Sequence, residues 1–176
     1  MYGSETGNCE QISADLQERL DQELESQKKY LQGRKVQRFQ LNDYGKGKAK
    51  LQTKDRLKLV VFICSSTGDG ESPENSLEFF RYLRRETGKL TKEVPLCNCH
   101  PDQTVTKHEQ GSALSHITYT VLGLGDSNYS KYQGAPRFLD QRVRMLGANS
   151  FSQRTEADEA TSLELVIEPW LESIAD

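Results

Sequence analysis

Apolar side chains recur at every fourth position in the first part of the chain, which is the spacing of an amphipathic helix. Ile12, Leu16, Leu20 and Leu24 follow this spacing, with glutamine, glutamate, aspartate and arginine between them. Their side chains share one face, so the pattern predicts a helix from about Cys9 to about Leu31. Similar patterns predict three later helices, at 73–88 with Pro73 in the first turn, at 138–147 and at 163–174.

Two short apolar runs have the composition of buried strands. Leu57–Cys64 is nearly continuous and rich in β-branched residues, and Ile117–Gly123 repeats the pattern. Such runs are typical of strands that a parallel sheet buries on both faces. Weaker strand patterns occur at 36–41 and 150–152. Because strands and helices alternate, the sequence predicts an α/β fold with a parallel sheet, right-handed crossovers and a ligand site at the carboxyl ends of the strands.

Composition and charge narrow the class of protein. The chain has 176 residues, 35% hydrophobic and 28% charged, which is typical of one soluble globular domain over residues 1–176. No apolar run reaches the roughly 18 residues of a membrane span, and no leader sequence opens the chain, so a cytoplasmic location is expected. The net charge of −3, without a basic stripe, argues against nucleic acid and suits docking on a basic protein.

The four cysteines offer one candidate metal site and two ordinary thiols. Cys97 and Cys99 stand beside His100, but no second cysteine or histidine pair completes a tetrahedral set, so a plain loop is the preferred interpretation. This cluster lies in the irregular segment 89–116, which is expected to be a long excursion. Cys9 and Cys64 are expected to be free and buried.

The loop before the first helix has the composition of an anion-binding site. Small and hydroxyl residues fill Tyr2–Asn8, so backbone N–H groups and hydroxyls can converge on a phosphate at the helix N-terminus. The loop lacks the Gly-Lys-Ser/Thr ending of a triphosphate loop and the spacing of a dinucleotide fingerprint. A simple helix cap is the alternative interpretation.

Two further glycine-containing loops follow the two clearest strands. Ser65–Glu71 holds two glycines one residue apart, which permit positive φ and close approach to a flat ligand, although a tight turn is the alternative. Leu122–Tyr129 ends in an aromatic residue among glycine, aspartate, serine and asparagine. Tyr129 can stack on a ring system there, or it can belong to the core.

Taken in order, the three loops resemble the FMN-binding loops of the diflavin reductase family. The matching motifs are Ser-x-Thr-Gly-Asn, Ser-Thr-Gly-Asp-Gly-Glu and Leu-Gly-Leu-Gly-Asp-Ser-x-Tyr. The family joins a flavodoxin-like FMN domain, with a doubly wound parallel sheet of order 2-1-3-4-5, to an FAD/NADPH module. The tail Ala157–Trp170 is most similar to the methionine synthase reductase branch of the family.

The resemblance implies a role for particular residues in each loop. The phosphate would be held by Ser4, Thr6, Gly7 and Asn8, with Glu5 contributing its backbone. The second loop would supply Ser66, Thr67, Gly68, Asp69 and Gly70, mainly along one face of the flavin ring. The other face and edge would be framed by Leu124, Gly125, Asp126, Asn128 and Tyr129, with Asp158 nearby. Related reductases carry an aromatic residue at the position of Thr67, so stacking on Tyr129 alone is expected.

The resemblance also implies an electron route. Electrons would pass from NADPH through FAD to FMN and on to a cobalamin-dependent methionine synthase. The FAD/NADPH module has no counterpart in these 176 residues, so the chain alone is not expected to oxidise NADPH. A phosphoacceptor receiver domain shares this fold, but its acidic cluster and its lysine after the last strand are not found.

The first strand of the expected sheet is the weak point of this interpretation. The first loop begins at Tyr2, so the first strand is expected to be truncated and no strand to feed the helix. A buried apolar side chain contributes about 1.5–3 kcal/mol, so losing a central strand would make the chain fold poorly or bind FMN weakly. The alternative function is therefore a shortened, flavin-free interaction fragment that keeps only the partner-docking surface.

Overall fold

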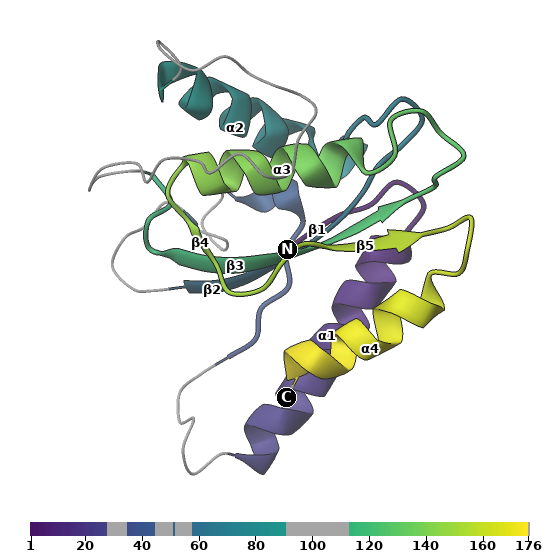
Figure 1. Cartoon of the computed structure of the whole chain (residues 1–176). Coiled ribbons are helices and arrows are strands. Elements are labelled where there is room, and N and C mark those ends of the chain that lie inside the picture. The colour runs from purple at the N-terminus through teal and green to yellow at the C-terminus, as the bar shows by residue number, and fades with distance from the viewer. Residues whose placement is uncertain (28–34, 45–50, 52–57, 91–112, 176) are drawn as a thin grey trace.

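The computed structural model of the chain describes residues 1–27, 35–44, 51, 58–90 and 113–175. It shows a parallel sheet between two layers of helices (Figure 1). The strands are β1 (Tyr2–Gly3), β2 (Lys58–Ser65), β3 (Ile117–Gly125), β4 (Asn149–Ser150) and β5 (Thr155–Asp158). The predicted α/β class is thereby confirmed.

The two strands expected from apolar runs form the centre of the sheet. β2 and β3 pair along eight residues, from Lys58 opposite Ile117 to Ser65 opposite Leu124. β3 is buried along nearly its whole length, as a strand covered on both faces must be. On its far side β3 pairs with β4 near its start and with β5 near its end.

The expectation that no strand feeds the first helix is wrong. β1 precedes the first loop and pairs with β2, with Tyr2 opposite Ile63. Its other edge meets the segment expected to form a strand at 36–41, which makes a single parallel bridge at Gln40 and then turns into the 3-10 helix Leu41–Asp43. The bridge at Gln40 lies where the expected order 2-1-3-4-5 has its second strand, but no strand forms there, and the order of the described strands is β1-β2-β3-β4, with β5 also paired to β3.

The helices form two layers, one on each face of the sheet (Figure 1). α1 (Asn8–Ser26) and α4 (Glu164–Ala175) cover one face, and α2 (Leu77–Leu90) and α3 (Gly134–Met145) cover the other. The expected extension of α1 to Leu31 lies outside the described residues from 28 onward. Pro73 starts a 3-10 turn, Glu74–Ser76, and the α-helix follows it.

Each face of the sheet has its own apolar core. Phe62 of β2 packs with Phe79 and Leu139 beneath α2 and α3, while its neighbour Ile63 packs with Leu16 and Trp170 beneath α1 and α4. This alternation is the two-residue period of a strand that is buried on both sides. The free thiols of Cys9 and Cys64 are buried, as expected.

The end of the sheet differs from the sequence prediction. The strand expected at 150–152 is β4, which ends at Ser150, and β5 was missed altogether. Only Ala157 of β5 is buried, so this edge strand lacks the apolar run by which strands are recognised. Most of the segment 89–116, with Cys97, Cys99 and His100, lies outside the described residues. No helix in the described part of the chain is long and apolar enough to cross a membrane.

Candidate functional site

The three loops singled out in the sequence leave the same edge of the sheet. The first, residues 4–7, joins β1 to α1, the second follows β2, and the third runs from β3 to α3 (Figure 1). β5 also ends at this edge, with Asp158 as its last residue. The carboxyl ends of parallel strands meet at one edge, which is where open α/β sheets bind ligands.

The first loop folds around the side chain of Ser4. Its hydroxyl oxygen accepts hydrogen bonds from the backbone N–H groups of Gly7, at 3.0 Å, and Cys9, at 3.2 Å. Gly7 has a φ of 98°, which a residue with a side chain rarely adopts. Thr6 and Asn8 stay exposed at the N-terminus of the 19-residue helix α1. The positive end of the helix dipole and these open polar groups suit an anion.

Two contacts attach the first loop to the segment that precedes α2. The backbone N–H of Ser4 donates to Oδ1 of Asn75 at 2.9 Å. The backbone N–H of Glu74 donates to the carboxylate of Glu5 at 3.1 Å. Asn75 therefore helps to place the loop, although no local pattern in the sequence singled it out. The side chain of Glu5 holds the loop to its neighbour.

The second loop closes on itself. Thr67 and Glu71 exchange two backbone hydrogen bonds, each 3.0 Å long. The tip between them contains Gly68 with a φ of 41° and Gly70 with a φ of 78°, so the positive φ angles expected from the glycine spacing are present. Gly68 and Asp69 are exposed at the tip.

The base of the second loop is fixed to α3. The hydroxyl of Ser66 accepts a hydrogen bond from the backbone N–H of Ala135 at 3.0 Å, which caps the helix from a distant part of the chain. Gly70 lies directly against Gly134, where a Cβ atom on Gly134 would lie 2.8 Å from the Cα of Gly70. Ser66 and Gly70 therefore have a structural role, because they fix the second loop to α3.

The third loop is held by two carboxylates. Asp126 accepts from the backbone N–H of Asn128 at 2.8 Å, and Asp158 accepts from those of Ser127 at 2.9 Å and Ala160 at 3.0 Å. The hydrogen bonds from Ser127 hold the pKa of the Asp158 carboxyl below its ordinary value. The ring of Tyr129 stands out from this loop with 56% of its surface exposed, so it does not belong to the core.

Gln133, at the end of the third loop, was missed by the sequence interpretation. It is fully buried, and it is the only residue other than glycine with a positive φ, 58°, in the described ranges. Its side-chain amide donates to the carbonyl oxygens of Gly123 at 3.0 Å and Ala157 at 3.1 Å, so it joins β3 to β5 where the third loop begins. A single buried glutamine between loop residues gives no periodic signal by which it could have been found.

The expected ligand residues differ in how far they are exposed. Leu124 and Gly125 are buried in β3: the side chain of Leu124 packs in the core beneath α1 and α4, and the Cα of Gly125 faces Tyr132. Only their backbone atoms are left to face a ligand. The exposed members, which can reach a ligand with their side chains or backbone, are Glu5, Thr6, Asn8, Gly68, Asp69, Asn128 and Tyr129.

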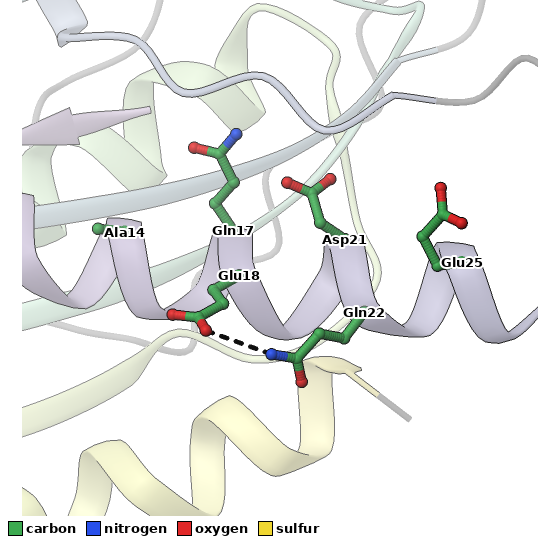
Figure 2. A pocket seen from close by; sticks show the side chains of 6 residues that line it. All are labelled: Ala14, Gln17, Glu18, Asp21, Gln22 and Glu25. Carbon is green, nitrogen blue, oxygen red and sulfur yellow. Dashed lines mark hydrogen bonds between the residues drawn. The ribbon is translucent and has the colours of Figure 1, made fainter.

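These residues fit a flavin mononucleotide. An open helix N-terminus can take one phosphate, and an exposed aromatic ring at the same edge can stack on a flat ring system. The surface hollow on α1 in Figure 2 is a different place, lined by Ala14, Gln17, Glu18, Asp21, Gln22 and Glu25. That hollow has neither an aromatic ring nor a basic group among its lining residues, so it does not suit an anionic flavin.

A parallel sheet with these loops at its carboxyl edge defines a mononucleotide-binding α/β domain. The family model described as Flavodoxin matches residues 1–170. The chain therefore belongs to the flavodoxin family. This membership indicates FMN as the cofactor, which confirms the prediction from the three loops.

Similar proteins confirm the resemblance to diflavin reductases. The chain is 33% identical to methionine synthase reductase of Caenorhabditis elegans over 171 residues, which covers 97% of the chain and 20% of that protein. It is 33% identical to NADPH-dependent diflavin oxidoreductase 1 of Schizosaccharomyces pombe over 159 residues, covering 90% of the chain and 21% of that protein. The chain thus spans about a fifth of the length of these relatives.

Solved structures agree on the fold. Oxidised flavodoxin 1 of Bacillus cereus superimposes with a TM-score of 0.60 at 15% identity, covering 98% of this chain and 90% of that one. A cysteine-to-alanine mutant of flavodoxin from Pseudomonas aeruginosa gives a TM-score of 0.61 at 20% identity, covering 99% and 93%.

Proposed function

We propose that this chain is the FMN-binding electron-transfer domain of a longer NADPH-dependent diflavin reductase. The observation that carries the proposal is the meeting of two features at one edge of the sheet. One is the open N-terminus of α1, and the other is the exposed ring of Tyr129. Each is common alone, but together they match the phosphate and the ring of one ligand.

Binding of the phosphate would rest on the first loop. Ser4 shapes the loop by holding Gly7 and Cys9, while Thr6 and Asn8 keep their polar groups open. An anion at a helix N-terminus gains about 0.3–1 kcal/mol from the dipole at the surface, and hydrogen bonds from backbone N–H groups add to it. FMN ends in such a phosphate, whereas riboflavin does not.

The ring would lie between the second and third loops. Tyr129 would stack on one face, and the tip at Gly68 and Asp69 would lie along the other. The bound flavin supplies the redox chemistry, and the protein sets the environment in which it occurs. Asp69, Asp126 and Asp158 would place negative charge around the ring, which would oppose the addition of further negative charge on reduction. We therefore expect a strongly reducing cofactor.

The rest of the electron route follows the relatives. Their names identify a methionine synthase reductase and NADPH-dependent diflavin oxidoreductases. We propose that an FAD/NADPH module donates electrons and that a methionine synthase-like protein accepts them. Helices α1 and α4 carry nine acidic side chains and one arginine, which suits docking on a basic partner. The cytoplasmic location stays a prediction.

The flavin-free interaction fragment remains the second candidate, and the acidic side chains of α1 and α4, which need no flavin to dock on a basic partner, favour it. Flavin content separates the two candidates. We expect the purified protein to release FMN on heating, at one per chain, and the released flavin can be identified by chromatography. Stoichiometric FAD would contradict the mononucleotide site, and a colourless protein that gains no flavin from added FMN would favour the fragment.

Electron transfer needs its own experiment. NADPH alone should not reduce the FMN of this chain. Addition of the separate FAD/NADPH module of a relative should lead to reduction, which is measured as a loss of flavin absorbance. Reduction by NADPH without the module would contradict the division of labour proposed here.

A further inference from the structure

Arg142 of α3 is a buried arginine without a carboxylate partner. Its exposed fraction is 9%. One terminal nitrogen donates to the hydroxyl of Thr87 at 3.1 Å, and the sulfur of Met145 lies 3.8 Å away. The Nε atom is buried and has no hydrogen-bond partner. Buried polar groups are nearly always satisfied, so an orphaned guanidinium N–H calls for an explanation.

A second arginine contacts the same aromatic ring as Arg142. The guanidinium of Arg84, on α2, lies 5.0 Å from the centre of the Phe138 ring, and that of Arg142 lies 4.8 Å from the same ring. Burial and the positive charge of Arg84 lower the pKa of Arg142 from its ordinary value. Two like charges therefore converge on one aromatic ring between α2 and α3.

The other arginines of this region show how such charges are usually balanced. Arg137 pairs with Glu156 at 3.0 Å, and Arg144 and Arg154 pair with Asp140 at 3.4 and 2.9 Å. Among the residues that the structure describes, neither Arg84 nor Arg142 forms an ion pair. The face of the Phe138 ring offsets part of the positive charge of these two arginines. The C-terminus of α2, which carries the equivalent of about half a negative elementary charge, offsets another part.

We propose that Arg142 and Arg84 form a binding site for a small oxyanion, a carboxylate or a phosphate group, between α2 and α3. The Nε–H of Arg142 supplies the inner donor, and Arg84, whose side chain is exposed, supplies the outer charge. Guanidinium groups match the planar oxygens of carboxylates and phosphates. Because Nε is buried in this structure, the side chains that cover it have to move for the anion to enter.

This site is separate from the flavin loops. Arg84 and Arg142 lie in the middle and last part of their helices, whereas the flavin loops precede the first turns of α1, α2 and α3. The inference therefore does not rest on FMN binding and can be tested with or without the cofactor.

The test observes the orphaned donor directly. In a ¹H–¹⁵N spectrum of the arginine Nε–H groups, the Arg142 signal is assigned by its loss in Arg142→Lys. The protein is titrated with inorganic phosphate and, separately, with acetate, while sodium chloride keeps the ionic strength constant. We expect a saturable shift of the Arg142 signal with at least one anion, and the anion that saturates distinguishes a phosphate from a carboxylate site.

Two variants decide whether the pair of arginines is responsible. Arg84→Gln should weaken anion binding by roughly tenfold, which corresponds to about 1.4 kcal/mol. Arg81→Gln, on the same helix but already paired with Glu78 at 2.5 Å, should leave it unchanged. The melting temperature in phosphate against chloride gives a second readout with the same expected pattern. Absence of a saturable shift with both anions, or a response that Arg84→Gln does not alter, would overturn the proposal.

Discussion

The side-chain amide of Gln133 donates to the backbone carbonyl of Gly123 at 3.0 Å. With its second bond, to Ala157, it fastens the end of β3 to the end of β5 just below the third loop. Gln133→Leu removes both of these bonds to buried carbonyl groups. A hydrogen bond contributes about 0.5–1.5 kcal/mol net, so we expect the free energy of unfolding in urea to fall by about 1–3 kcal/mol. Gln153→Leu, at an exposed position, is the control and should change it little.

Gly123 should not tolerate a side chain. A Cβ atom there would lie 2.1 Å from Oε1 of Gln133 and 2.7 Å from Cβ of Pro136. Gly123→Ala is expected to destabilise the domain by about 1–3 kcal/mol, the usual cost of overpacking. Gly88→Ala is the matched control, since nothing lies within 4 Å of its Cβ position in α2. It should stabilise the domain by up to about 1 kcal/mol through helix propensity. Equal effects of the two variants on the melting temperature would refute this packing argument.

Tyr129 is expected to serve the ligand rather than the fold. Its ring is 56% exposed, so Tyr129→Ala should leave the free energy of unfolding of the flavin-free protein nearly unchanged. Loss of a stacking contact of about 0.5–1.5 kcal/mol should weaken FMN binding about two- to twelvefold and increase the fluorescence of the bound flavin. Tyr129→Phe keeps the ring and should bind like the unchanged protein. Unaltered affinity in Tyr129→Ala would place the flavin elsewhere.

Ser4 is expected to serve both the fold and the ligand. Ser4→Ala removes the acceptor for the N–H groups of Gly7 and Cys9. Replacing such a cap costs about 0.5–2 kcal/mol, which urea unfolding can measure. FMN affinity should fall as well, because the loop loses its shape. Ser4→Thr keeps the hydroxyl and should retain most of both properties. If Ser4→Thr lost as much FMN affinity as Ser4→Ala, FMN binding would not depend on the hydroxyl group.

The lowered pKa of Asp158 predicts that the stability of the domain falls in acid. Its folded-state pKa is lowered by the hydrogen bonds from Ser127, so its contribution is present above the unfolded pKa, about 3.9, and is lost as the pH falls through the folded value. Asp158→Asn keeps an acceptor oxygen but no longer titrates. Urea unfolding between pH 2 and 6 should therefore show a shallower loss of stability in acid for this variant. Identical acid profiles would show that the bonds to Ser127 do not favour the charged form.

The central elements were predictable because their physics is local. The apolar runs of β2 and β3 and the spacing of Ile12 and Leu16 in α1 arise from burial within each element, and the sequence displays that directly. β5 escaped prediction because Glu156 lies at a sheet edge and is satisfied by Arg137 and Arg154 rather than by burial.

In the candidate site, too, local features could be predicted from the sequence and features that depend on the fold could not. The loops around Ser4, Gly68 and Tyr129 were recognisable because glycine and hydroxyl residues stand at strand ends. Asn75 and Gln133 were not, since each acts on backbone groups that the fold, and not the sequence order, brings near. The same holds for the convergence of Arg84 and Arg142 on Phe138.

The most direct test of the account is a comparison of FMN with riboflavin. A fluorescence titration of the protein with each flavin measures both the ring contact and the phosphate contact, since only FMN carries the phosphate. We expect FMN to bind at one per chain and riboflavin to bind at least tenfold more weakly, a difference of about 1.4 kcal/mol for the anion site at α1. Equal affinity for the two flavins, or binding of neither by the folded protein, would contradict the account.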